Sequence, residues 1–297
     1  EDDNNPFYIA PFQTSAEKVW DLIHTDLALN VHFDSSSIDG YATLTLKPHF
    51  YSQDSLVLDA VNMEIYEVLT HIEESKSGVN GSNVFIPPPT RLKFNYRRNK
   101  KLVVYFNETI TANQPVSIRI QYSATPGKKD TTWINTENEA ISDDIGMYFI
   151  NAEGKNPTKP TQMWTQGEPQ SNCHWFPTLD APNQKHTQRI SITFPGNMQS
   201  LSNGELKSSV EMFGNNGSHW RTHVWVQNKP HAPYLTMLAV GNWVRVKDSL
   251  PWPIDPNLRK KETLPIEYLV EPQFKDDAKM IFGNTPEMIQ FFSQYTG

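Results

Sequence analysis

Several residue patterns that define common protein classes are missing from this chain of 297 residues. The only cysteine is Cys173, which excludes an intrachain disulfide and a cysteine-rich metal site. No run of eighteen apolar residues occurs, so the sequence predicts no membrane-spanning helix. The formal net charge is −7 and there is no long basic run, which argues against nucleic acid or an anionic membrane surface as a partner.

Sequence signatures of catalysis are missing as well. None of the nine histidines is followed by Glu, so there is no His-Glu-x-x-His zinc helix, and no Gly-x-Ser-x-Gly motif is present. Only His219 and His223 are four residues apart, and the alternating residues around them predict a strand. Four residues along a strand span about 13 Å, too far for two ligands that each lie about 2 Å from one metal. Cys173 and His174 would point to opposite faces of a strand, so the sequence predicts neither a metal site nor catalytic residues in this chain.

Alternation of apolar and polar residues dominates from Asp21 to about Val246. This period of two places one set of side chains on one face of a sheet, which is typical of half-buried antiparallel strands. The clearest runs cover 92–96, 102–106, 116–122, 190–194 and 220–226, and turn pairs occur at Asp39-Gly40, Asn80-Gly81, Pro126-Gly127, Asn203-Gly204 and Asn216-Gly217. The sequence therefore predicts a mainly β fold, an antiparallel β-sandwich or open barrel.

Three segments depart from this pattern. Residues 123–165 have no clear period, and the proline-rich residues 248–263 predict a linker or an exposed loop. After a strand over 265–270, the spacing becomes helical from Gln273, with Thr285 as the expected N-cap before Pro286. We therefore expect a β-rich amino-terminal domain over residues 1–264 and the beginning of a second domain over 265–297, which would continue after Gly297.

A carboxamide and a carboxylate, Gln166 and Glu168, lie two residues apart in the segment from Trp164 to Pro169. They precede an aromatic and proline-containing turn with an acid, Asp180. A carboxylate among so many aromatic residues is either desolvated at a cost or held by hydrogen-bond donors. Taken alone, these residues leave two interpretations of Glu168 open: the buried cap of a turn, or an anchor for a cation.

The order of the motifs along the chain resembles that of the aminopeptidase N-like zinc metallopeptidases, the gluzincin aminopeptidases. The resemblance is carried by residues 23–33 and 38–47, Ser55–Asp59, Gly146-Met-Tyr148, Gln166 with Glu168, Phe176-Pro177, Asp180-Ala-Pro182, Tyr234–Gly241 and Met288–Gly297. It implies that residues 265–297 begin a thermolysin-like catalytic domain. It also implies that Glu168 binds the ammonium group of a peptide substrate and that Gln166 shapes the pocket for the first side chain.

The function implied by this resemblance is that of the substrate-amine-anchoring part of a zinc-dependent aminopeptidase. Its partners would be peptides with a free amino terminus and the rest of its own catalytic domain. The zinc ligands and the general base would follow Gly297, so we expect this chain alone to be inactive and to hold no cofactor. The chain departs from the family at Asn172-Cys-His-Trp175, where Arg residues are frequent, and at Ala181, where the family has Glu.

Other functions and two compartments remain open at this point. Aromatic residues make up 11% of the chain, which is compatible with a free-standing β-sandwich module that binds carbohydrate or peptide. A non-catalytic relative that only scaffolds an assembly is a further alternative. For the compartment, the sequence leaves open an exported protein whose signal was removed before Glu1 and a cytoplasmic one.

Overall fold

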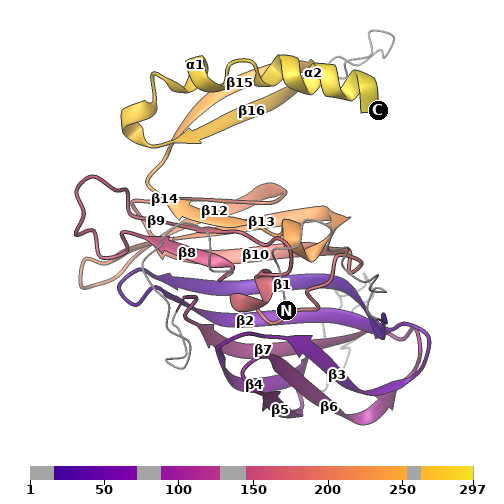
Figure 1. Cartoon of the computed structure of the whole chain (residues 1–297). Coiled ribbons are helices and arrows are strands. Elements are labelled where there is room, and N and C mark those ends of the chain that lie inside the picture. Colours follow the sequence, from indigo (N-terminus) through magenta and orange to yellow (C-terminus); the bar gives the residue numbers. More distant parts are fainter. Residues whose placement is uncertain (1–16, 72–87, 128–144, 253–261, 297) are drawn as a thin grey trace, which may run out of the picture.

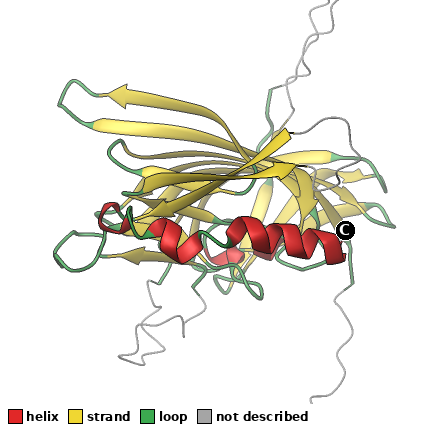
Figure 2. Ribbon diagram, turned by 90° about the horizontal axis from the view of Figure 1, so that it is seen from above, coloured by secondary structure: helices red, strands yellow, loops and turns green. Residues whose placement is uncertain are grey.

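The computed structural model describes residues 17–71, 88–127, 145–252 and 262–296, and most of these residues lie in β-strands (Figures 1 and 2). The largest sheet has seven strands, in the order β12-β13-β10-β1-β2-β7-β4. Their bounds are β12 Glu205–Phe213, β13 His219–His231, β10 His186–Pro195, β1 Trp20–His32, β2 Ser37–Pro48, β7 Val116–Ala124 and β4 Met63–His71. The mainly β fold predicted from the alternation is confirmed.

Neighbouring strands of this sheet are antiparallel with one exception, which the sequence analysis did not anticipate. β1 and β10 run parallel, with Leu27 opposite Ile190 and Leu29 opposite Ile192. The sheet is therefore mixed. Alternation gives the same side-chain pattern in either direction when one face is buried, so it does not distinguish the two pairings.

Two smaller sheets complete a single hydrophobic core with the large one. The three-stranded sheet has the order β3-β6-β5 and the four-stranded sheet the order β11-β14-β9-β8. The bounds are β3 Gln53–Asp59, β6 Lys101–Ile110, β5 Lys93–Arg97, β11 Gln199–Ser202, β14 Leu238–Gly241, β9 Gln162–Thr165 and β8 Met147–Ile150. Leu44 from the large sheet, Leu58 from the three-stranded sheet and Met163 from the four-stranded sheet are fully buried in one cluster. The three sheets therefore form an open, layered β-structure.

One predicted turn is wrong. Gly40 lies inside β2, where it pairs with Leu29, and the chain instead turns at residues 33–36. Gly40 has φ +146°, and a Cβ atom there would come less than 3.0 Å from the carbonyl oxygen of Ala28. Its glycine is therefore required by close approach to a neighbouring strand and not by a turn. The turn predicted at Asn80-Gly81 lies outside the described residues.

The segments expected to be irregular contain regular structure. β8 and β9 lie within 123–165, and β15 (Val244–Trp252) pairs with β16 (Glu262–Val270) around the expected linker. Proline in β15 misled the prediction: Pro251 pairs with Thr263 in a two-stranded ribbon, where each strand has an unpaired edge that tolerates a missing N–H. The strand predicted over 265–270 is confirmed as part of β16.

Two helices follow this ribbon, as the helical spacing predicted. They are α1 (Ala278–Phe282) and α2 (Thr285–Thr296), and with β15 and β16 they lie at one end of the molecule in Figure 1. Thr285 is the first residue of α2, and the Met288 N–H donates to the Asn284 carbonyl at 3.0 Å, so Asn284 and not Thr285 occupies the predicted N-cap position. Neither described helix has the length and apolar content of a membrane span. The domain boundary at 264/265 falls inside β16 and stays a prediction.

A buried histidine, His186, lies at the start of β10. His186 is fully buried, and its Nδ1 atom contacts the Gln184 carbonyl at 3.2 Å. Burial lowers the pKa of His186 to about 4, and the nearby rings of His231 and His24 lower it further, although the contact with Gln184 opposes the change. The neutral ring is therefore the form that the folded chain favours.

We predict that His186 makes the chain less stable in acid. Its folded-state pKa of about 4 lies below the ordinary value of 6.5, so its contribution to the free energy of unfolding is complete above pH 6.5 and is lost as the pH falls toward 4. The full contribution is on the order of 3 kcal/mol. Urea unfolding between pH 7.5 and 4 should show a flatter pH dependence for His186→Gln than for the wild type. His32→Gln, on the opposite face of the large sheet, is the control, and equal slopes for wild type and His186→Gln would contradict the assignment.

Candidate functional site

The 166–168 turn, which carries Gln166 and Glu168, begins where β9 ends. β8 pairs with β9, and Tyr148 lies opposite Trp164 with ring centroids 4.7 Å apart. The Gln166 N–H then donates to the Gly146 carbonyl at 2.9 Å. The Gly146-Met-Tyr148 motif therefore lies directly beside the 166–168 turn, although the two motifs are separated in sequence.

Two glycines allow the backbone to pack this closely. Gly146 has φ +70°, and a Cβ atom there would lie less than 3.0 Å from the Ser171 carbonyl oxygen. A Cβ atom on Gly167 would lie less than 3.0 Å from the Tyr234 carbonyl oxygen and from the side-chain nitrogen of Asn172. The turn between Gln166 and Glu168 is therefore pressed against its surroundings, and no larger residue fits at Gly167 without movement.

The two predicted site residues differ in their surroundings. Glu168 is exposed, and its carboxylate forms no hydrogen bond or ion pair with another described residue. Its backbone N–H lies 3.5 Å from Oε1 of the half-buried Gln166, and its carbonyl accepts a hydrogen bond from the Ser171 hydroxyl at 3.2 Å. The interpretation of Glu168 as a buried cap is therefore wrong. The backbone of the turn is held, while the carboxylate stays available for a cation.

Asp180, the other acid of this segment, is buried. Its Oδ2 atom accepts a hydrogen bond from the Cys173 N–H at 2.9 Å, and its backbone N–H donates to Asp59 Oδ2 at 3.1 Å. Oδ1 of Asp180 is buried and has no partner in the described part of the chain. Burial raises the pKa of Asp180 to about 6 against the lowering effect of the Cys173 hydrogen bond, and the Asp59 carboxylate raises it further. Asp180 therefore stabilises the segment best in its protonated form.

Cys173 does not have the surroundings of a nucleophile. It lies with His174 in a 3₁₀ turn, Asn172–His174, and not in the strand that the sequence analysis considered. Burial raises the pKa of its thiol well above the ordinary range, and the carboxylates of Asp180 and Asp59 raise it further. A thiol in this environment stays protonated and inert.

The strand predicted around His219 and His223 is confirmed as β13. The buried His223 shares a hydrogen bond with the Ser200 hydroxyl at 2.7 Å, whereas the His219 ring stacks on Phe213 with a centroid distance of 4.4 Å. Among the described residues, no group of three or more His, Cys, Asp or Glu side chains is arranged to hold a metal. The described side chains therefore do not fit a zinc ion.

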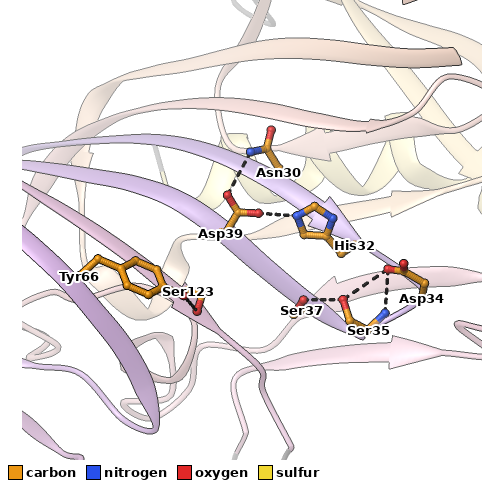
Figure 3. Close-up of polar contacts among 8 residues, drawn as sticks. All are labelled: Asn30, His32, Asp34, Ser35, Ser37, Asp39, Tyr66 and Ser123. Atoms are coloured by element: carbon orange, nitrogen blue, oxygen red, sulfur yellow. Dashed lines mark hydrogen bonds and ion pairs between the residues drawn. The ribbon is translucent and has the colours of Figure 1, made fainter. Parts of the chain in front are cut away.

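A second polar cluster, shown in Figure 3, lies at the turn between β1 and β2. His32 Nε2 is bonded to Asp39 Oδ1, and Asn30 donates to Asp39 Oδ2 at 3.2 Å. Ser37 is bonded to Ser35 at 2.8 Å, and no hydrogen bond joins it to His32 in the part of the chain shown. A serine activated by a histidine and an aspartate is therefore not assembled here.

A cavity of about 420 Å³ separates the four-stranded sheet from the carboxyl-terminal ribbon and helices. Its walls come from the four-stranded sheet on one side and from the ribbon and helices on the other, and they are mainly apolar. They include Gln162, Ala239, Trp243, Leu269 and Phe282. This junction lies on the same side of β9 as Trp164, because Gln162 and Trp164 alternate with the buried Met163.

Sequence reasoning identified the two polar residues of the turn but not what holds them. Gly167 and Asn172 are both in tight contact with the turn or its supports, yet neither was assigned a role. The glycine between two polar residues was an available signal of close backbone approach. Nothing in the sequence indicated the hydrogen bonds from Asn172 to the Pro233 and Thr236 carbonyls, because these residues are more than sixty positions away.

A comparison of this sequence with models of known protein families assigns the chain to a family. Residues 22–235 match the model of the peptidase M1 N-terminal domain. This chain belongs to that family. The resemblance to the aminopeptidase N-like metallopeptidases is thereby confirmed, and the match ends before β14 and the β15-β16 ribbon.

Individual relatives of this M1 domain have different names. Mouse glutamyl aminopeptidase is 25% identical over 207 residues, which are 70% of this chain and 19% of that protein. Subunit 2 of transcription initiation factor TFIID from Schizosaccharomyces pombe is 24% identical over 213 residues, or 66% of this chain and 16% of that protein. The chain therefore spans about a fifth or less of the length of these curated relatives.

A solved structure shows the same fold. It is a two-domain M1 zinc metallopeptidase mutant bound to L-tryptophan, with a TM-score of 0.62 and 17% identity. The match covers 88% of this M1 chain and 50% of the solved one. At this identity the likeness concerns the arrangement of the strands.

We predict that ionised Asp180 destabilises the fold. Its folded-state pKa of about 6 lies above the ordinary 3.8, so its favourable contribution is complete below pH 3.8 and is lost as the pH rises through 6. The loss is on the order of 3 kcal/mol. Thermal melts from pH 4 to 7.5 should show that Asp180→Asn gains stability relative to the wild type as the pH rises. A difference that stays constant with pH would contradict this, and Asp276→Asn, at an exposed position, is the surface control.

Proposed function

We propose that this chain is the substrate-amine-anchoring part of a zinc-dependent aminopeptidase, which removes amino-terminal residues from peptides. One observation carries the proposal. The carboxylate of Glu168 is exposed and unpaired among the described residues, although the backbone of its turn is fixed by hydrogen bonds from both sides. Membership of the M1 family supplies the class of reaction that such a carboxylate would serve.

The role of Glu168 follows from the chemistry of an ammonium group. The free amino terminus of a peptide carries a positive charge and three donors, and a carboxylate held at a fixed position pairs with it strongly and directionally. A blocked amino terminus brings no charge, so the carboxylate would be desolvated without a partner. Gln166, two residues earlier, offers a neutral amide that would contact the first residue of the same peptide.

Zinc would be held by residues outside the part of the chain described here. The described side chains do not fit it, as the dispersed histidines show, so no step of the reaction is derived from them. Zinc in such enzymes supplies a water molecule activated for attack on the peptide bond. What this chain's own residues do in the proposal is bind and orient the substrate amine. The described part of the chain would therefore have no peptidase activity of its own.

The rest of the catalytic domain is the second partner in this proposal. The two helices expose more apolar side chains than is usual on the surface of a soluble protein. The most exposed are Met280 at 80%, Tyr295 at 75%, Ile281 and Phe292 at 60%, Met288 at 54% and Phe291 at 51%. A folded catalytic domain would cover this surface and the cavity beneath it, and it would bring the zinc site toward Glu168.

A second candidate function has one observation in its favour. The chain is similar to a subunit of transcription initiation factor TFIID, a protein whose name refers to an assembly. In that case this chain would be a non-catalytic scaffold, and Glu168 would be an ordinary surface carboxylate. The two functions differ in whether replacing Glu168 changes the handling of free amino termini.

We predict that Glu168→Gln impairs hydrolysis by the complete protein. The replacement keeps the size of the side chain and removes the charge, so kcat/KM for peptides with a free amino terminus should fall about tenfold to a hundredfold. Steady-state hydrolysis of an amino-acid anilide would measure this. Glu108→Gln, which changes an exposed carboxylate on β6, is the matched control and should leave kcat/KM unchanged. Equal activity of the wild type and Glu168→Gln would refute the anchoring role, and a wild type without activity would favour the scaffold.

A further inference from the structure

Asn172 is a fully buried polar residue that neither the family match nor the proposed function assigns a role. It begins the 3₁₀ turn Asn172–His174, four residues after Glu168. Burying a carboxamide is costly unless its donors and acceptor are all satisfied. The position of Asn172 therefore depends on the partners that it finds.

The side chain of Asn172 joins its own 3₁₀ turn to the 3₁₀ turn Pro233–Leu235, which is distant in sequence. Its Nδ2 atom donates to the carbonyls of Pro233 and Thr236, at 2.5 Å and 3.3 Å, on the 3₁₀ turn Pro233–Leu235 and its C-cap. Its Oδ1 atom accepts a hydrogen bond from the indole N–H of the fully buried Trp175 at 2.8 Å. The amide thus uses both donors and its acceptor inside the protein.

The same amide and the same 3₁₀ turn form the surface on which the 166–168 turn lies. The space that a side chain at Gly167 would need is taken by the Asn172 side-chain nitrogen and the Tyr234 carbonyl. Gly167 is the residue between Gln166 and Glu168, and its carbonyl also accepts the Ser171 N–H at 2.9 Å. Gly167, the residue directly before Glu168, is therefore packed against both Asn172 and the Tyr234 carbonyl.

We propose that Asn172 is a positioning residue for amine recognition, because it fixes the backbone from which Glu168 projects. This inference rests on the proposed function of Glu168 and adds a residue that contacts no substrate. An aspartate at this position would place a carboxylate oxygen against two carbonyl oxygens, and an alanine would leave the indole N–H of Trp175 without its acceptor. The neutral carboxamide is the side chain that satisfies all of these partners.

The test measures selectivity for the amine, which a loss of stability alone does not change. Two competitive inhibitors of the complete protein would be compared, leucine hydroxamate and 4-methylpentanohydroxamate, which differ only in the α-amino group. The ratio of their inhibition constants isolates the contribution of the amine. We expect the wild type to prefer the amine-bearing probe, and Asn172→Ala to reduce this preference about tenfold.

Ser200→Ala is the matched control for stability. Ser200 is buried in β11 and accepts a hydrogen bond from the Trp225 indole at 2.9 Å, so its removal costs a buried contact of a similar kind. We expect this variant to melt at a lower temperature and to keep the wild-type ratio. An Asn172→Ala protein that melts lower but keeps the wild-type ratio would overturn the inference.

A gentler variant keeps the test decisive if Asn172→Ala does not fold. Trp175→Phe removes the indole donor to Asn172 Oδ1 together with part of a buried ring, leaves the Asn172 side chain in place, and should lower the preference for the amine about two- to threefold. An unchanged ratio in a folded Trp175→Phe protein would also overturn the positioning role. A wild type that binds both probes equally would contradict the proposed function itself, and that result is distinct from an effect limited to the variants.

Discussion

The segment from Gln166 to Asp180 is tied to two different sheets, and the candidate site depends on this constraint. At its beginning, the Gln166 N–H bonds to Gly146 at the edge of the four-stranded sheet. At its end, Thr178 forms a two-way backbone bridge with Asp59, the last residue of β3 in the three-stranded sheet. A connection fixed at both ends loses little further entropy when a ligand binds, which favours a preorganised contact over an adaptable one.

The two acidic residues of this segment, Asp180 and Glu168, differ in their exposure to solvent. Asp180 accepts a hydrogen bond from the Cys173 N–H. Because Asp180 is buried, desolvation raises its pKa and disfavours its charged form. Glu168 is exposed, and its carboxylate has no partner among the described residues. Two carboxylates twelve residues apart in sequence therefore lie in opposite environments. The buried one holds the segment in place, and the exposed one is available for binding.

Much of the fold was predictable because alternation reports which face of a strand is buried. In β2 every second residue from Ile38 to Pro48 is buried, as the pattern indicated. What alternation could not indicate was the parallel pairing of β1 with β10, since strand direction leaves no trace in the period. Gly40 misled the analysis because glycine serves both turns and close strand contacts. In the candidate site, the sequence singled out Gln166 and Glu168, whose roles stay a prediction, but not Asn172, whose carbonyl partners Pro233 and Thr236 lie more than sixty residues away.

The central claim is that this M1 domain serves a zinc aminopeptidase, and the coding sequence after the Gly297 codon tests it most directly. The account predicts a reading frame that continues into Gly-x-Met-Glu-Asn, then His-Glu-x-x-His and a later Glu, which together supply the metal ligands and the general base. A frame that continues without a zinc-binding motif would contradict the claim and favour the scaffold function. A stop codon directly after Gly297 would also contradict it, because the described residues hold no zinc site.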